Sequence, residues 1–165
     1  MRQLALGVRA LHQAGMLHRD LKPSNVMVVG ARVVVLDFGL VRELGMNAAT
    51  VTEDGSVAGT PAYMAPEQLL GKELTAASDW YAFGAIMYEL FSGLLPIDGS
   101  LVEILRRKLD SDPTPLSQLA PGVPATLAEL CMALLSRDPA ARPSGDAVVA
   151  ALDALSNPKP VEPYR

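Results

Sequence analysis

The sequence has very few of the features that mark secreted or membrane-spanning proteins. Its single cysteine, Cys131, excludes an internal disulfide, and the leucine and alanine residues around it favour a buried thiol. No basic segment followed by an apolar one opens the chain, so we expect no leader. The most apolar stretch, Trp80 to Leu95, contains Glu89 and two glycines and falls short of membrane-spanning length. These absences predict a cytoplasmic protein with no membrane segment.

A strong excess of either charge is also lacking. The chain has 14 Lys and Arg residues against 18 Asp and Glu residues, which gives a net charge of −4. So small an acidic excess gives no reason to expect nucleic acid or an anionic membrane as a partner. What is present, 165 residues with 50% hydrophobic and 19% charged side chains, is typical of one compact domain with a sizeable core.

The spacing of apolar residues predicts a mainly α-helical domain with one small β-hairpin. Two valine-rich runs, Asn25 to Val29 and Arg32 to Leu36, flank Gly30-Ala31 and predict a tight hairpin. The first helix is expected over Arg2 to Leu17, with Gly15 marking its end. A long apolar helix, expected to be the buried centre, and three shorter ones follow at Thr75 to Ser92, Leu101 to Leu109, Ala125 to Leu135 and Ser144 to Leu155.

The end of the chain differs in composition from the rest. Residues 157–165 contain three prolines and no apolar period. Such a segment is typical of an extended linker or a frayed end. We therefore expect one domain over residues 1–156 and a proline-rich tail or linker over residues 157–165.

Polar side chains suited to phosphoryl transfer gather in the run HRDLKPSN, residues 18–25. Phosphoryl transfer needs a carboxylate at the acceptor hydroxyl, a cation against the transferred group and an oxygen ligand for magnesium. Asp20, Lys22 and Asn25 supply these types, and a loop containing Pro23 can aim all three to one side. Twelve residues beyond Asn25, Asp37 directly follows the second predicted strand and stands two residues before Gly39, so it is a natural magnesium ligand on a permissive hinge.

In order and spacing, these motifs resemble those of the protein kinase family. Besides HRDLKPSN and the Asp-Phe-Gly motif at Asp37, the run GTPAYMAPE at residues 59–67 is similar to the end of a kinase activation segment. The run DWYAFG at residues 79–84 is similar to the start of the central helix of the family. Arg142, within DPAARP, resembles the arginine that pairs with the glutamate closing the segment. The resemblance covers about residues 2–155, and several motifs in the right order are strong evidence together.

The resemblance implies a protein-kinase-like C-terminal lobe of the eukaryotic serine/threonine type, with a composition similar to that of bacterial members. It implies that Asp20 is the catalytic base, that Lys22 steadies the γ-phosphate of ATP, and that Asn25 and Asp37 hold Mg²⁺. The lysine at position 22 and Thr60 resemble the serine/threonine branch of the family. The expected substrate is therefore a Ser or Thr hydroxyl of a protein.

Several further residues have a structural alternative of about equal or greater weight. Met27 matches the apolar floor beneath adenine, and an ordinary core methionine is the equal alternative. His18 and Phe38 are expected to pack and hold the loops together. Asp79 could cap its helix, but the resemblance implies that it holds the backbone of the catalytic loop.

The resemblance also implies an ion pair that closes the activation segment. Glu67 and Arg142 lie far apart in the sequence, so an exposed pair between them would contribute almost nothing. A buried bidentate pair would instead attach the activation segment to the helical body. We expect the buried form.

Regulation is suggested by Arg19, which directly precedes Asp20 and which the resemblance links to control by activation-loop phosphorylation. Arg42 could join Arg19 in binding a phosphate. By analogy Ser56, four residues before Thr60, is the best-placed acceptor, and Thr52 is the next. A hydroxyl-rich loop that is merely polar is an equal alternative.

The elements by which the N-terminal lobe of a kinase binds ATP have no match in these residues. The sequence contains no glycine-rich loop, strand lysine or partner glutamate ahead of the first helix. We therefore expect an adenine pocket that is formed on one side only, and exposed apolar surface where an N-terminal lobe would dock. We also expect this chain alone to bind ATP weakly. Three interpretations remain open: part of a longer kinase, which we favour, a non-catalytic module that binds kinases or substrates, and a degenerate remnant.

Overall fold

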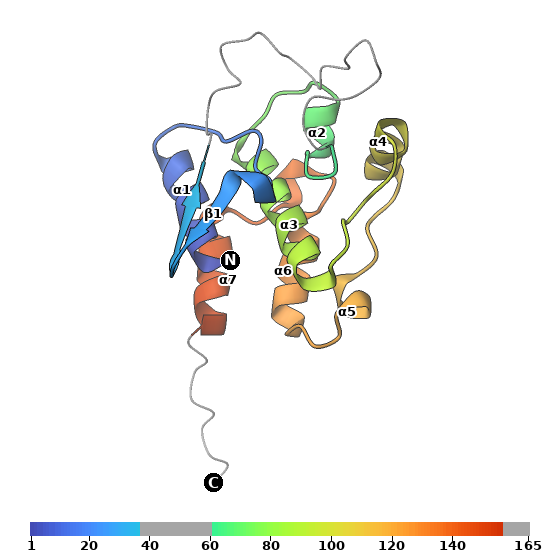
Figure 1. Cartoon of the computed structure of the whole chain (residues 1–165). Coiled ribbons are helices and arrows are strands. Elements are labelled where there is room, and N and C mark those ends of the chain that lie inside the picture. Colours follow the sequence, from blue (N-terminus) through green and yellow to red (C-terminus); the bar gives the residue numbers. More distant parts are fainter. Residues whose placement is uncertain (37–60, 157–165) are drawn as a thin grey trace.

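A computed structural model describes residues 1–36 and 61–156, which form a helical body with a two-stranded sheet at one side (Figure 1). Over the described residues, no helix combines the length and the hydropathy needed to cross a membrane. Residues 157–165, predicted to be a tail or linker, lie outside the described part. The elements are α1 Arg2–Gln13, β1 Val26–Val29, β2 Arg32–Val35, α2 Pro66–Leu69, α3 Ala76–Ser92, α4 Leu101–Asp110, α5 Leu116–Leu119, α6 Ala125–Leu134 and α7 Gly145–Ser156, with short 3-10 turns at Pro23–Asn25 and Pro139–Ala141.

The predicted central helix is α3, and its residues from 78 to 88 are all buried. Thr75 caps its first turn through a side-chain oxygen that accepts from the backbone N–H of Ala77 at 3.3 Å. Its other end is closed by Gly93, whose φ of 72° lies in the left-handed region that glycine adopts without strain. At Gly84 a Cβ atom would lie only 2.7 Å from Cβ of Leu134. Glycine at this position therefore allows α6 to pack closely against α3.

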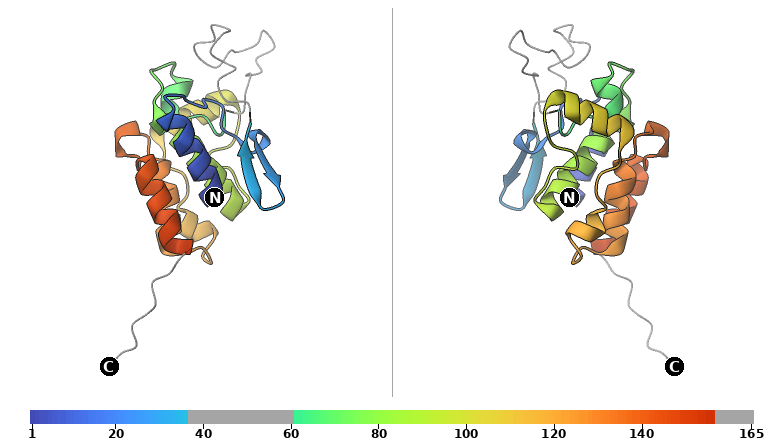
Figure 2. Two further views of the ribbon diagram at one scale, coloured as in Figure 1. Left: turned by 90° about the vertical axis from the view of Figure 1, so that its left-hand side faces the viewer. Right: turned by 90° about the vertical axis from the view of Figure 1, so that its right-hand side faces the viewer.

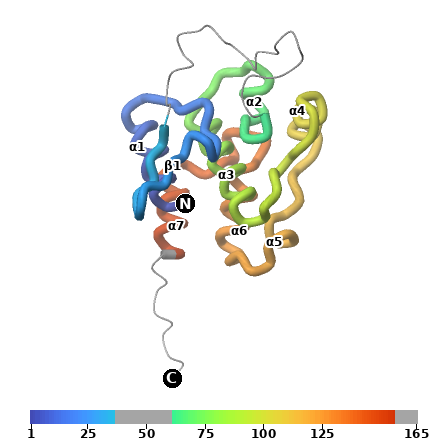
Figure 3. Tube along the Cα trace, viewed as in Figure 1, coloured from blue at the N-terminus to red at the C-terminus, as the bar shows by residue number. Residues whose placement is uncertain are grey.

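The remaining helices surround α3 on different sides (Figures 1 and 3). Helix α1 packs against α7 and against strand β2, whereas α5 and α6 pack against each other and against α3. Helix α4 contacts α2. Figure 2 shows the hairpin at the edge of the body, attached on the side of α1. One consequence of this arrangement is that the loop between α1 and β1 lies next to the start of α3.

The predicted hairpin is present, with antiparallel pairing from Val26 opposite Val35 to Val29 opposite Arg32. Gly30 has a φ of 58°, as the tight turn requires. The side chain of Gln3 attaches the hairpin to α1, because its amide donates to the carbonyl of Ala31 at 2.7 Å and accepts from the N–H of Val33 at 2.8 Å. The hairpin exposes apolar side chains, as expected, with Met27, Val29 and Val34 on one face and Val28 on the other.

Some predicted boundaries were wrong in detail. The first helix ends at Gln13 and not at Leu17, and Gly15 has a φ of 74° just beyond it. Asn25 belongs to a 3-10 turn that precedes the strand, so the strand begins at Val26. The four-residue helices α2 and α5 were not predicted, because one turn is too short to produce an apolar period.

Cys131 is buried and forms no disulfide, as the sequence predicted. Its thiol lies 3.5 Å from the carbonyl oxygen of Gly84 on α3. Burial raises the pKa of this thiol to about 12. The side chain is therefore a small apolar part of the contact between α3 and α6.

Candidate active site

The loop between α1 and β1 brings together the three side chains predicted to carry the chemistry. The Lys22 ammonium lies 2.7 Å from Oδ2 of Asp20. The side-chain amide of Asn25 donates to the same oxygen at 3.2 Å and to the backbone carbonyl of Asp20 at 2.8 Å. A cation and an amide therefore converge on the same carboxylate.

The backbone of this loop is held by the carboxylate of Asp79, which is 2% exposed. One oxygen accepts from the N–H of His18 and the other from the N–H of Arg19, each at 2.8 Å. The imidazole of His12 contacts the same carboxylate at 2.8 Å. Asp79 thus contacts the loop backbone, as the resemblance implied, while Thr75 caps the helix.

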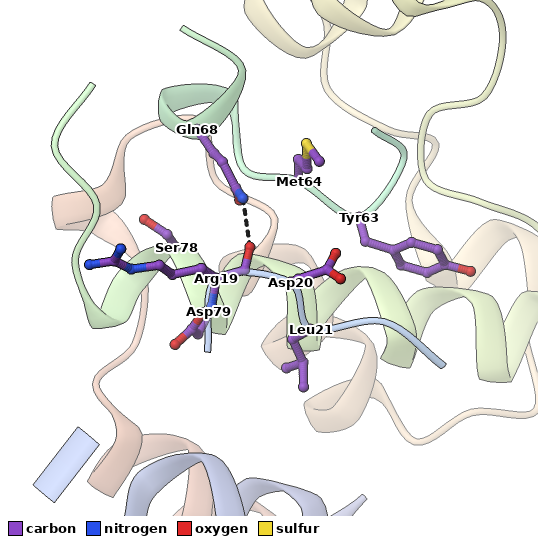
Figure 4. A pocket seen from close by; sticks show the side chains of 9 residues that line it. Arg19, Asp20, Leu21, Tyr63, Met64, Gln68, Ser78 and Asp79 are labelled. Atoms are coloured by element: carbon purple, nitrogen blue, oxygen red, sulfur yellow. Dashed lines mark hydrogen bonds between the residues drawn. The ribbon is translucent and has the colours of Figure 1, made fainter. Parts of the chain in front are cut away.

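Arg19 has an unusual backbone conformation. Its φ of 70° makes it the only non-glycine residue with a positive φ among residues 1–36 and 61–156. A non-glycine residue in this region costs on the order of 1–3 kcal/mol, so surrounding contacts must impose it. Besides Asp79, the side chain of Gln68 holds it by donating to the carbonyl of Arg19 at 2.6 Å (Figure 4). Both the N–H and the carbonyl of Arg19, the residue before Asp20, are therefore held by hydrogen bonds.

His18 packs in the interior and joins two parts of the site. Its side chain is buried, and Nε2 lies 2.9 Å from the carbonyl oxygen of Leu36. In addition, the N–H of Leu36 donates to the carbonyl of Asn25 at 2.9 Å. Both backbone polar groups of Leu36, the residue before Asp37, thus contact the loop between α1 and β1. Of the other predicted site residues, the following lie outside the described part of the chain: Asp37, Phe38, Arg42, Thr52, Ser56 and Thr60.

The oxygen ligands in this loop suit a magnesium ion that also binds phosphate. The Asn25 amide nitrogen donates to Asp20, which leaves the amide oxygen to accept or coordinate. No group of three or more His, Cys, Asp and Glu residues that could form a full cage occurs in the part of the chain that the structure describes. Magnesium in phosphoryl-transfer sites needs only one or two protein oxygens, because phosphates and water complete its shell.

A pocket lies beside Asp20, between the loop that joins α1 to β1, the segment from Tyr63 to Gln68 and the first turns of α3 (Figure 4). In this view the side chains of Arg19 and Asp20 point in opposite directions from the loop. The hydroxyl of Tyr63 donates to Glu89 of α3 at 2.6 Å, which fixes the tyrosine at the pocket wall. The pocket is lined by Arg19, Asp20, Leu21, Tyr63, Met64, Gln68, Ser78, Asp79 and Ala82.

The predicted pair of Glu67 and Arg142 is buried and bidentate. Nη1 and Nη2 of Arg142 donate to the two carboxylate oxygens at 2.6 and 2.8 Å, and the hydroxyl of Ser78 donates to the carboxylate at 2.8 Å. Burial by itself raises the pKa of Glu67, but the hydrogen bonds and charge of Arg142 outweigh it and hold this pKa below its usual range. The start of α2 is therefore attached to the body of the domain by a charged contact.

Sequence reasoning missed two residues, Gln68 and Lys108. Gln68 had no signal, because its partner is a backbone carbonyl far away in the sequence. Lys108 had one, because it stands four residues after Ile104 on the apolar face of the predicted helix Leu101 to Leu109. The structure buries its ammonium against the carbonyl oxygens of Ala62 and Met64. A lysine at a core-facing position is rare unless it has a partner.

Comparison with known proteins identifies the family. The model of the protein kinase domain matches residues 1–154. The chain is 40% identical to the serine/threonine-protein kinase pkn2 of Myxococcus xanthus, over 94% of this chain and 20% of the relative. It is also 38% identical to PknL of Mycobacterium tuberculosis, over 86% of this chain and 36% of the relative. The chain thus spans between a fifth and about a third of the length of these two relatives. On these matches, the chain belongs to the protein kinase domain family.

Proposed function

We propose that this chain is the catalytic C-terminal lobe of a protein serine/threonine kinase, which transfers the γ-phosphoryl group of ATP to a Ser or Thr hydroxyl of a protein. The observation that carries the proposal is the convergence of Asp20, Lys22 and Asn25 on one loop. The relatives, which are named serine/threonine-protein kinases, support the same reaction.

Each of the three side chains has a role that its position suits. The carboxylate of Asp20 orients the acceptor hydroxyl and takes its proton, because it borders the pocket in which that hydroxyl would enter. The Lys22 ammonium, 2.7 Å from Asp20, places positive charge against the transferred phosphoryl group. Magnesium supplies neutralising charge to the phosphates, and the Asn25 oxygen, together with Asp37, would hold it.

ATP binding requires a second surface above this loop. In the proposal an N-terminal lobe packs on the exposed apolar face of the hairpin and supplies the glycine-rich loop and strand lysine. Met27, which is 43% exposed on β1, forms the floor beneath adenine. The side chain then becomes buried only when nucleotide and N-terminal lobe are both present.

Control by phosphorylation forms part of the proposal. A phosphate on Ser56 or Thr52 would pair with Arg19 and Arg42 and order the segment that leads to Thr60. Mass spectrometry of the active kinase is the test, and a segment that is always unmodified contradicts this part of the proposal.

The reaction is tested by magnesium-dependent transfer of labelled phosphate from ATP to a generic basic protein. Three proteins are compared: this chain, the chain fused to the N-terminal lobe of a bacterial relative, and the same fusion with Asp20→Ala. We expect transfer by the fusion and a loss of about 10²-fold or more with Asp20→Ala, the usual contribution of a general base. A matched Asp110→Ala fusion, changed at an exposed carboxylate on α4, should keep its activity. A folded fusion with no transfer contradicts the proposal and favours a binding module.

A further inference from the structure

Lys108 is a buried cation that the reaction proposed above does not use. It lies on the inner face of α4 and is 1% exposed. Its ammonium donates to the carbonyl oxygen of Ala62 at 2.8 Å and to that of Met64. The two acceptors are the carbonyl groups of the residues before and after Tyr63. One side chain therefore fixes two alternate carbonyls of the segment that leads to α2.

The surroundings of this ammonium are unusual for a buried charge. Within residues 1–36 and 61–156, no carboxylate forms a salt bridge with Lys108. The ring of Tyr81 lies 4.8 Å from the ammonium, and the guanidinium of Arg142 lies 5.0 Å from the same ring. Burial lowers the pKa of Lys108 to about 7, with a smaller raising effect from Glu67 and a smaller lowering effect from Arg142. A buried charge held only by carbonyls and a ring contributes little to stability.

The contacts of Lys108 end at the pocket beside Asp20. Tyr63 and Met64 both line this pocket, together with Asp20 itself. The tyrosine is already tied to α3 through Glu89. The Lys108 bonds add two backbone contacts, one on each side of Tyr63. The pocket wall next to Asp20 is therefore held in part from α4.

We propose that Lys108 is a positioning residue for the protein substrate, which acts by holding residues 62–64 in the conformation that forms the pocket wall. The inference rests on the proposed kinase function and deepens it, because it assigns part of substrate binding to α4. The role requires donors at this position more than it requires charge. It predicts an effect on the protein substrate that leaves ATP unaffected.

The test compares three variants of the active fusion: Lys108→Met, Lys108→Gln and, as a matched control, Arg106→Met. Methionine keeps the length and packing but cannot donate, whereas glutamine keeps two N–H donors without the charge. The control Arg106→Met removes a positive charge from the exposed face of the same helix. We expect Lys108→Met to raise KM for the protein substrate about tenfold, as the loss of two hydrogen bonds would, with kcat and KM for ATP unchanged. Lys108→Gln should restore KM in large part, and Arg106→Met should match the wild type.

A second readout does not depend on activity. The carbonyl ¹³C resonances of Ala62 and Met64 should shift in Lys108→Met and stay in place in Arg106→Met. An unchanged substrate KM in folded Lys108→Met overturns the inference, and so does a parallel rise in KM for ATP. If Lys108→Met does not fold, Lys108→Gln is compared with an unrelated destabilised variant. Equal increases in substrate KM in these two proteins also overturn the inference. If the wild-type fusion transfers no phosphate, the proposed function fails. Carbonyl resonances that do not move in Lys108→Met would separately refute the contact of Lys108 with residues 62–64.

Discussion

Loss of the Arg142 guanidinium should be far more damaging than loss of a surface charge. Substitution Arg142→Met keeps most of the apolar stem but removes both bonds to Glu67, and leaves that carboxylate buried with only the hydroxyl of Ser78 as a side-chain partner. It also removes donors to the carbonyls of Ser136 and Ala77, each now accepting at 2.8 to 2.9 Å.

The expected cost follows from this uncompensated charge. Breaking a buried ion pair from one side costs about 3–5 kcal/mol, because the remaining charge has lost its partner in a medium of low polarity. A domain of this size has only about 5–15 kcal/mol of stability in total. Arg142→Met should therefore remove a large fraction of it. Glu67→Gln together with Arg142→Met should cost less than the sum of the two single changes, because no buried charge then remains.

Urea unfolding of the chain at pH 7 measures these differences, and the fluorescence of Trp80, the single tryptophan and a buried one, reports the core. Arg137→Met is the matched control. Its guanidinium pairs with Asp112 at 3.1 Å, with side chains that are 46% and 69% exposed, so its loss should cost at most about 1 kcal/mol. Equal costs for the two arginine variants would refute the argument from burial.

The sign of the pH dependence is a separate check on the same pair. In the wild type the pKa of Glu67 is lowered, so its contribution to stability is full above its unfolded pKa of about 4.5 and is lost as the pH falls below it. In Arg142→Met the pKa of Glu67 is set only by burial and the remaining hydrogen bonds, so it should rise. As the pH falls toward and below this raised pKa, Arg142→Met should gain stability relative to the double variant Glu67→Gln, Arg142→Met. A loss of stability in both proteins over this range contradicts the assignment.

Two further predictions concern the residues that sequence reasoning missed. Gln68→Met removes the donor to the carbonyl of Arg19 and should lower kcat about tenfold with little change in KM for ATP, because the strained residue before Asp20 is released; unchanged kinetics in a steady-state assay would show that Asp79 is sufficient. Because the pKa of Lys108 is lowered by burial, the unfolded chain binds one more proton than the folded chain between about pH 7 and 10.5. The free energy of unfolding, relative to that of Lys108→Met, should therefore rise by up to about 1.4 kcal/mol per pH unit over this range. A difference that stays constant in urea titrations would contradict the lowered pKa.

Long elements were predictable because their burial leaves a period in the sequence. The apolar spacing of α3 and the valine runs around Gly30 are produced by the same packing that the structure contains. Helices α2 and α5 were missed because each has four residues, which is about one turn. Local sequence carries no information on whether such a turn closes, since this depends on its tertiary neighbours.

The site divides in the same way between local and distant contacts. Asp20, Lys22 and Asn25 were predictable because their grouping is local and their chemistry follows from residue type. The pairing of Glu67 with Arg142 came from resemblance, and spacing alone left it open. The donation of Gln68 to a backbone carbonyl was beyond reach, because any residue type can supply the acceptor. Distant side-chain to backbone contacts are therefore what the fold adds to the motif.

One helix relates these contacts to one another. Near its start α3 presents Asp79 to the loop between α1 and β1 and Ser78 to Glu67 of α2, and near its end Glu89 accepts from Tyr63 at the pocket wall. Three parts of the site that are far apart in the sequence thus contact a single helix, which is buried from residue 78 to residue 88. A shift of any one part relative to α3 requires breaking a hydrogen bond to this helix. These contacts explain how the loop before Asp20 can keep a strained backbone conformation.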